Sequence, residues 1–360
     1  MLKRLYVHNY KCLVNFEINF DKDISLFLGA NGSGKSTVFE VLTKLKRVIV
    51  NEEKVENVFD DSDAPRWLGR CDTIRFELDF EKSSSTSRYI LTLAFNKWPE
   101  ISIEKESLFM DNDMVLECID EMMVLHGNDQ REIWFDHSRS SLSRYYKGLP
   151  FLNYLNTLFV VRINPYEMVS TFSKANLDVK SDFSNFAEWF ADLNEKSRRE
   201  VSVFETAMRG ILPGYEYFKI DPAGQAKVLM FEFENTANKK LPLRYYFNEL
   251  SEGQKVLIAL YALVYCVPEN SIICIDEPEN FLALPEIQPW LNELRDKCKE
   301  RNLQALLISH HPSLINFLAT DSGYWFSRQD NHTRYEKITE QEEDGLSLAQ
   351  LIEMGWIYGD

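Results

Sequence analysis

Short apolar runs at the start of the chain predict strands. The runs Leu2–Val7, Phe16–Phe20 and Ile24–Leu28 are rich in β-prone residues, and the third ends at a glycine-rich turn. Beyond this turn, apolar residues recur at helical spacing, at Val38, Val41, Leu42 and Leu45. The pattern therefore predicts a strand, a glycine-rich loop and a helix in this order.

The apolar period changes to two in the next part of the chain. Thr73–Phe80 and Tyr89–Phe95 alternate apolar and polar residues, and the serine-rich stretch Ser83–Ser87 lies between them. This arrangement predicts an antiparallel hairpin, which Ile101–Glu104 extends by a third strand.

The middle of the chain, from about Asp113 to Leu212, is expected to be largely helical. Two amphipathic stretches mark it, and Pro213-Gly214 closes the second. Their apolar positions are Phe183, Phe186, Phe190 and Leu193, followed by Val201, Phe204, Met208 and Ile211.

Strands return from Tyr215 onward and then alternate with helices. A helix is expected from Ser251, a very apolar strand at Ile272–Ile275 and a further strand at Ala305–Ile308. Alternation at this spacing predicts an α/β fold with a parallel sheet covered on both faces. We expect three parts, residues 1–110, a helical insertion at 111–214, and residues 215–360.

The segment Gly29-Ala30-Asn31-Gly32-Ser33-Gly34-Lys35-Ser36 fits the phosphate-binding pattern G-x-x-x-x-G-K-[ST] between the predicted strand and helix. Glycines let successive N–H groups face the phosphates, the lysine reaches the outer phosphates, and the serine hydroxyl binds magnesium. The loop alone is compatible with kinases, GTPases and ATPases. The residues expected to bind nucleotide are Asn31, Gly32, Ser33, Gly34, Lys35, Ser36 and Thr37, and Ser36 is also a metal candidate.

A second motif, Leu250-Ser251-Glu252-Gly253-Gln254, precedes an apolar helix. A serine followed three residues later by glutamine is also an ordinary capping box. The stretch resembles the LSGGQ signature loop of the ABC ATPase superfamily, whose serine and neighbouring amides face the γ-phosphate of ATP held by the opposite subunit. Ser251, Gly253 and Gln254 match this loop, and Glu252 replaces its first glycine.

Acidic residues and histidines follow the two apolar strands of the C-terminal part. Asp276 and Glu277 come directly after Ile272–Ile275, at the strand end where doubly wound sheets place ligands. They resemble the Walker B aspartate, which binds magnesium, and the catalytic glutamate, which polarises the attacking water. His310 resembles the family's switch histidine. The adjacent His311 is the alternative, and His310 is preferred because it directly follows the strand-terminal serine.

The resemblance covers about Met1–Phe80 and Leu241–Ser327. It implies an ABC ATPase head with a mostly parallel P-loop sheet, an antiparallel β subdomain and a helical insertion. Asp276–Asn280 and Asn9-Tyr10-Lys11 are similar to the AAA-family group that includes RecF-like, OLD-like, SMC-like and phage-defence ATPases.

Two family motifs are altered in this chain. Because no glutamine occurs between Thr37 and Gln130, the usual Q-loop is not identifiable, and Arg162 or Asn164 are the candidates for its place. The D-loop is also unusual and reads Asn280-Phe281-Leu282-Ala283-Leu284.

Composition narrows the picture further. The 360 residues are 45% hydrophobic and carry a net charge of −16, which indicates a globular protein without a generally cationic surface. Six cysteines lack metal-ligand spacing and are typical of reduced core thiols. No signal-like start or membrane-length apolar run is visible, so we expect a soluble, cytoplasmic protein.

The resemblance implies an ATPase that binds ATP and Mg²⁺ in two head-to-tail sites of a homodimer or a higher oligomer. The preferred role is a sensor or regulator in antiphage defence or DNA maintenance, with a separate effector such as a nuclease. The alternative is a DNA-binding repair clamp or loader with a basic surface around Arg198, Arg199 and Arg209. A transporter ATPase is disfavoured by the inserted hairpin and by the long gap between Lys35 and Leu250.

Overall fold

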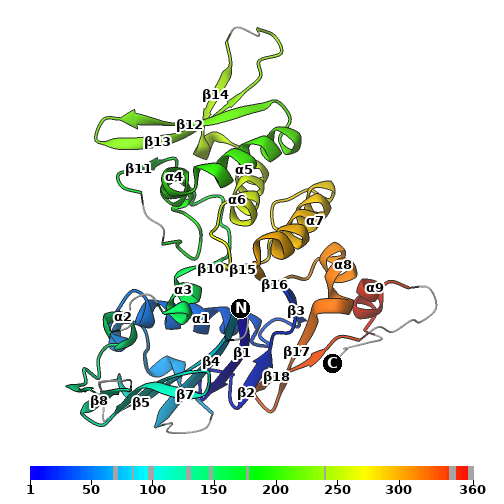
Figure 1. The fold of residues 1–360 in the computed structure, drawn as a ribbon. Helices are drawn as coiled ribbons and strands as arrows, with labels where there is room; N and C mark the ends of the chain where they lie inside the picture. The colour runs from blue at the N-terminus through cyan, green and yellow to red at the C-terminus, as the bar shows by residue number, and fades with distance from the viewer. Residues whose placement is uncertain are drawn as a thin grey trace. The chain divides into compact units, whose positions relative to one another are not determined.

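The computed structural model describes residues 1–67, 72–82, 85–95, 101–126, 131–145, 149–175, 178–238, 241–339 and 346–355 (Figure 1). The chain forms two compact units. The first unit is Met1–Leu158 with Leu318–Asp360, and the second unit is Phe159–Phe317. Within the described ranges, none of the helices combines the length and apolar character that a membrane crossing needs.

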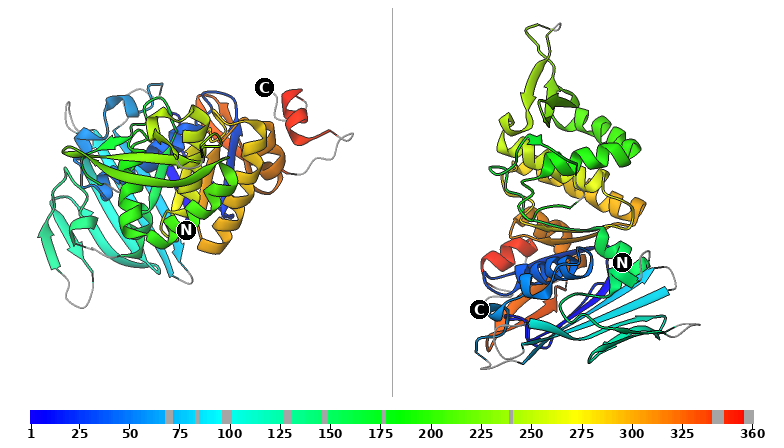
Figure 2. Two further views of the ribbon diagram at one scale, coloured as in Figure 1. Left: turned by 90° about the horizontal axis from the view of Figure 1, so that it is seen from above. Right: turned by 90° about the vertical axis from the view of Figure 1, so that its left-hand side faces the viewer.

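An antiparallel sheet of eight strands dominates the first unit, in the order β2-β1-β4-β5-β6-β7-β8-β9. Figure 2 shows its neighbouring strands, coloured blue to blue-green, running side by side. The predicted hairpin is confirmed in β4 and β5, whose pairing begins at Lys82 and Ser85, so Ser85–Ser87 belong to a strand rather than to the turn. The strands are β1 Leu2–His8, β2 Phe16–Asn19, β4 Thr73–Lys82, β5 Ser85–Phe95, β6 Ile101–Met110, β7 Asp113–Ile119, β8 Met122–Leu125 and β9 Arg131–Trp134.

The expectation of a helical chain from Asp113 is wrong for its first part. Asp113–Trp134 contains β7, β8 and β9, which pair in sequence as antiparallel neighbours. The first helices of this region are the short α2, Leu142–Tyr145, and α3, Pro150–Asn156. Each new strand here pairs with the edge of the sheet already formed, and this long-range context overrides a weak local pattern. The functional lobes 1–110, 111–214 and 215–360 stay a prediction.

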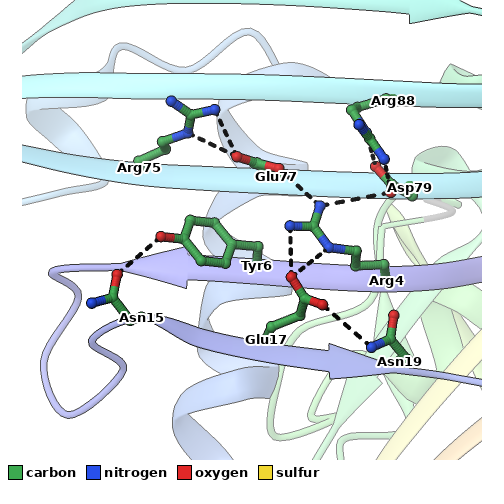
Figure 3. Close-up of polar contacts among 9 residues, drawn as sticks. All are labelled: Arg4, Tyr6, Asn15, Glu17, Asn19, Arg75, Glu77, Asp79 and Arg88. Atoms are coloured by element: carbon green, nitrogen blue, oxygen red, sulfur yellow. Dashed lines mark hydrogen bonds and ion pairs between the residues drawn. The ribbon is translucent and has the colours of Figure 1, made fainter. Parts of the chain in front are cut away.

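One face of the antiparallel sheet carries a ladder of charges (Figure 3). Arg4 on β1 contacts Glu17 and Glu77, each at 2.8 Å, and Arg88 on β5 contacts Asp79 at 2.8 Å. Arg75 donates to the other oxygen of Glu77 at 2.8 Å. Since each of these arginines already faces a carboxylate, the ladder does not form the cationic surface that phosphate backbones require.

The buried side of this sheet contains a carboxyl group among neutral donors. Glu106 on β6 is fully buried and accepts hydrogen bonds from Tyr89 Oη at 2.8 Å and from Ser141 N at 2.9 Å. Desolvation raises the pKa of Glu106, and a hydrogen bond from Ser140 opposes this shift. The ionised form is therefore disfavoured in the folded protein.

Replacing Glu106 with glutamine is expected to remove part of the pH dependence of stability. Because the pKa of Glu106 is raised on folding, its contribution is complete below the ordinary value of 4.5 and is lost as pH rises through the folded pKa. In this variant, the side-chain oxygen of the new glutamine can accept from Ser141 N, and its NH₂ group can donate to the Tyr89 and Ser140 hydroxyls. Urea unfolding at several pH values should show the variant gaining stability over wild type as pH rises, and Glu117→Gln in the same sheet is the control. If the free energies of unfolding of variant and wild type differ by the same amount at every pH, the expectation is contradicted.

The glycine-rich loop of the first unit lies between a fully buried strand, β3 Ile24–Gly29, and α1, Lys35–Ile49. The predicted strand, loop and helix are confirmed. Strand β17, Gly323–Gln329, runs parallel to β3 and pairs with β18, His332–Lys337, as an antiparallel hairpin. The 3-10 turns Val55–Asn57 and Asp61–Asp63 and the helix α9, Leu348–Glu353, complete the described part of this unit.

The second unit has its own pair of parallel strands, β15 Ile272–Asp276 and β16 Gln304–Ile308, with β10, Leu158–Val161, beside β15. Both predicted strands are confirmed. Helix α6, Glu252–Tyr265, is buried over nearly its whole length, as expected for a helix that is apolar on all sides. Helix α7, Leu284–Arg301, connects β15 to β16, and α8, Pro312–Ser322, follows β16.

The predicted amphipathic helices are α4, Phe186–Lys196, and α5, Arg198–Ile211. Figure 1 shows them beside a second antiparallel sheet formed by β11 Thr171–Phe172, β12 Tyr215–Ala223, β13 Ala226–Phe233 and β14 Leu243–Tyr246. The ring of Phe186 stacks on Phe190 and on Phe247, and Phe190 meets Phe204 and Phe218 edge to face. This aromatic core fixes the helices on the sheet.

Candidate nucleotide-binding and hydrolysis site

The phosphate-binding loop has the backbone that its glycines predict. Gly29, Gly32 and Gly34 have φ values of 130°, 78° and 106°, which favour glycine over other residues. The Lys35 side chain is buried and donates to Gly29 O at 2.6 Å, Ala30 O at 2.9 Å and Ser33 Oγ at 3.4 Å. A buried ammonium group inside a ring of oxygen acceptors, at the first turn of a helix, fits the binding of phosphate oxygens.

The β17–β18 hairpin holds this loop from outside, which the sequence did not reveal. Thr333 Oγ1 donates to Ser33 O at 2.8 Å, and Arg328 Nη1 lies 3.4 Å from Gly32 O. A Cβ atom on Gly34 would lie 2.2 Å from Thr333 Oγ1, so the hairpin excludes any larger residue there. These residues are about 300 positions from the loop in the chain, and no local pattern connects them to it.

The signature-like loop lies at the exposed N-terminus of α6. Ser251 is the N-cap, and its Oγ accepts from Gln254 N at 3.3 Å while Gln254 Oε1 accepts from Ser251 N at 3.1 Å. The capping-box interpretation is therefore confirmed, and Ser251 is exposed at the same time. A Cβ atom on Gly253 would lie 3.0 Å from Phe281 O, which explains a glycine at this position. The structure thus joins the signature-like loop to Asn280–Leu284.

The acidic pair lies at the carboxyl end of β15. Asp276 is the last residue of the strand and is nearly buried. Glu277 follows it with a φ of 55°, an uncommon backbone angle for a glutamate, and its N–H donates to Ile308 O at 2.8 Å. Asn280 Nδ2 donates to Glu277 Oε2 at 2.9 Å. The glutamate is therefore fixed in position by the turn that follows β15, and strained backbone of this kind is frequent at active sites.

The two histidines after β16 have different surroundings. His311 Nδ1 accepts from Ser313 N at 3.1 Å at the start of α8, which is a structural contact. His310 is exposed, and its N–H lies 3.4 Å from Glu279 Oε1, which also accepts from Ser309 Oγ at 2.7 Å. Burial raises the pKa of Glu279, and the hydrogen bond from Ser309 opposes this shift. No local sequence pattern singles out Glu279, yet its carboxylate anchors the segment that carries His310.

Arg162 and Asn164, the two candidates for the position of the Q-loop residue, make different contacts. Arg162 follows β10, and its Nη2 lies 2.5 Å from Glu277 Oε2. Asn164 Oδ1 instead accepts from Tyr166 N at 3.2 Å, within its own turn. Lys255 on α6 donates to Pro165 O at 2.7 Å and so attaches this turn to the helix that begins at the signature-like loop.

Two family models match the chain. One, described as "AAA ATPase domain", matches residues 1–202, and the other, described as "AAA domain, putative AbiEii toxin, Type IV TA system", matches residues 119–316. Among curated proteins, the chain is similar to the DNA replication and repair protein RecF of two strains of Leptospira biflexa serovar Patoc, with 24% identity over 152 residues. This match spans 40% of the chain and 40% of each relative.

Two solved structures of SMC heads are similar to this chain. The SMC head domain from Thermotoga maritima has 14% identity and a TM-score of 0.49, and the match covers 94% of this chain and 99% of that one. The SmcHead bound to the C-winged helix domain of ScpA has 13% identity and a TM-score of 0.55, with coverages of 94% and 98%. The predicted ABC ATPase head fold is confirmed. The family model described as "AAA ATPase domain" matches residues 1–202, which is more than half of the sequence, so this chain belongs to the AAA ATPase domain family.

Proposed function

We propose that the chain is an ATP-dependent switch that binds MgATP in the loop Gly29–Thr37 and hydrolyses it with Glu277 and His310. The arrangement around Lys35 carries this proposal, because its buried ammonium group is surrounded by oxygen acceptors in a loop that opens onto a helix N-terminus. Membership of the AAA ATPase domain family supports the same conclusion.

Hydrolysis requires a group that orients water against the γ-phosphate. The water oxygen forms a bond to phosphorus, the bond to the β-phosphate oxygen breaks, and ADP and phosphate leave. Glu277 suits the role of water-orienting base, since Asn280 in the turn that follows it donates to its carboxylate and directs it. Magnesium, bound by the Ser36 hydroxyl and the Asp276 carboxylate, would neutralise phosphate charge when present.

Exposed apolar side chains near the signature-like loop support pairing with a second copy. Tyr166, Phe281 and Leu284 are 70%, 45% and 68% exposed. The rings of Tyr166 and Phe281 meet edge to face at 5.6 Å, and the Phe281 carbonyl faces Gly253. Large apolar groups that gather on a surface mark interaction sites. We therefore propose that this surface and Ser251 cover the nucleotide of the partner copy, so that two ATP molecules hold a homodimer together.

Replacing Phe281 with aspartate is expected to prevent ATP-dependent pairing while ATP binding persists. The change removes apolar contact area and adds a charge that repels the triphosphate. Aspartate also tolerates the φ of 70° at this position. With a non-hydrolysable ATP analogue, light scattering should show pairing weakened by about tenfold or more, which corresponds to roughly 1.4 kcal/mol.

Val203→Asp is the matched control, since Val203 on α5 is 48% exposed. It should leave pairing unchanged. An unaltered dimer of the Phe281 variant, or equal loss of pairing in both variants, would contradict the proposed interface. Failure of the wild-type chain to bind the analogue in calorimetry would contradict the proposed function itself.

For the biological role, we propose a sensor or regulator that acts with a separate effector in antiphage defence or DNA maintenance. The AbiEii toxin named in one matching family description supports the first setting, and the match to RecF supports the second. The RecF match also supports a DNA-binding repair clamp as the second candidate. Arg198, Arg199 and Arg209 are exposed on α5, interspersed with Glu200 and Glu205. Salt-dependent binding to duplex DNA would favour the clamp, and an effector that co-purifies with the ATP-bound protein would favour the regulator.

A further inference from the structure

The carboxylate proposed as the general base is occupied by an arginine. Arg162 Nη2 lies 2.5 Å from Glu277 Oε2, the same oxygen that accepts from Asn280 Nδ2 at 2.9 Å. The backbone N–H of Arg162 donates to Ser181 O at 2.7 Å, so the start of this side chain is held in place directly after β10. Two donors therefore share one oxygen of the base.

The two partners of this ion pair differ in freedom of movement. The Arg162 side chain is 65% exposed, whereas that of Glu277 is 28% exposed and is fixed by its turn. Exposed ion pairs contribute little to stability, so the guanidinium group can exchange partners at small cost. A planar guanidinium binds phosphate oxygens in the same paired geometry that it uses for carboxylates, and a triphosphate carries more charge than one carboxylate.

We propose that Arg162 exchanges between Glu277 and the γ-phosphate of bound ATP. This inference rests on the proposed function. When Arg162 moves to the phosphate, Glu277 Oε2 keeps only the donor Asn280 Nδ2 and can accept a hydrogen bond from the attacking water. It also places positive charge where negative charge develops as the bond to the β-phosphate oxygen breaks and ADP leaves. One side chain thus pairs with the base in one arrangement and assists the reaction at the phosphate in the other.

If the Arg162 side chain moves between Glu277 and the γ-phosphate, its removal should have an effect that removal of a purely structural ion pair would not have. ATP has a γ-phosphate and ADP lacks it, so loss of Arg162 should affect the binding of the two nucleotides differently. A structural pair would change both affinities together, through altered folding of the turn. A pair that only masks the base would give a faster enzyme when Arg162 is removed.

The experiment compares Arg162→Ala, Arg162→Lys and wild type in ATP turnover and in calorimetric titration with a non-hydrolysable ATP analogue and with ADP. For Arg162→Ala we expect kcat to fall on the order of 10³-fold, as for other arginines that stabilise the transferring phosphoryl group. Analogue affinity should fall about tenfold and ADP affinity less than about twofold. Arg162→Lys should recover part of kcat, because it restores the charge without the paired geometry.

Arg244→Ala is the control, since Arg244 is 59% exposed and pairs with Glu232 at 2.7 Å in the same unit. It should leave the ATP-to-ADP affinity ratio unchanged. Unchanged or faster turnover of Arg162→Ala, or an equal loss of analogue and ADP affinity, would overturn the exchange while the proposed function stands. A wild-type protein without ATP binding or turnover would overturn both.

Discussion

Replacing Lys35 with alanine is expected to reduce ATP affinity by about 100-fold or more, or roughly 3 kcal/mol, which is the scale of lost charge-assisted hydrogen bonds. Its ammonium group is the cation inside the loop, and it is bound there by Gly29 O, Ala30 O and Ser33 Oγ. Phosphate oxygens in the same loop would take over these contacts. Isothermal titration with ATP and magnesium measures the loss.

The Lys35 experiment needs a separate test of folding, since the lysine side chain is itself buried. Lys35→Met keeps most of the volume of the side chain, so circular dichroism and thermal unfolding of this variant distinguish lost binding from lost structure. Lys22→Ala, at an exposed lysine between β2 and β3, is the control and should bind like wild type. If both Lys35 variants bind ATP with unchanged affinity, the loop is not part of the nucleotide-binding site.

Replacing Glu277 with glutamine is expected to lower kcat by about 10²-fold or more while ATP binding persists. The amide has the shape of the carboxylate and keeps an oxygen that accepts from Asn280 Nδ2. It cannot take a proton from water at neutral pH. Because hydrolysis would release the proposed dimer, the variant should accumulate as an ATP-bound dimer, and size-exclusion chromatography with light scattering in the presence of ATP would detect it.

Glu269→Gln provides the matched control for Glu277, because Glu269 is an exposed glutamate just before β15. It should retain the turnover and the monomer–dimer behaviour of wild type. The contradicting result is a Glu277→Gln protein that remains monomeric with ATP and hydrolyses it at the wild-type rate. Such a protein would show that another group orients the water.

Local sequence was sufficient for the elements whose pattern is strong over a short distance. The loop between β3 and α1 depends on glycines and a lysine within eight positions, and the capping box at Ser251 depends on residues three apart. The apolar strands that end at Asp276 and Ile308 are likewise evident from their own residues. In each case the physical cause, a backbone angle, a cap or a buried strand, lies inside the segment itself.

Residues distant in the chain decided the rest. The strands β7, β8 and β9 exist because an edge of the antiparallel sheet is available for pairing, and Thr333 reaches the phosphate-binding loop only through the β17–β18 hairpin. The contact of Arg162 with Glu277 joins residues 115 positions apart. Sequence by itself determined which chemical groups this protein has and where its nucleotide loop lies. Only the tertiary structure decided which of those groups meet, because hydrogen bonds and ion pairs depend on distance in space and not on separation along the chain.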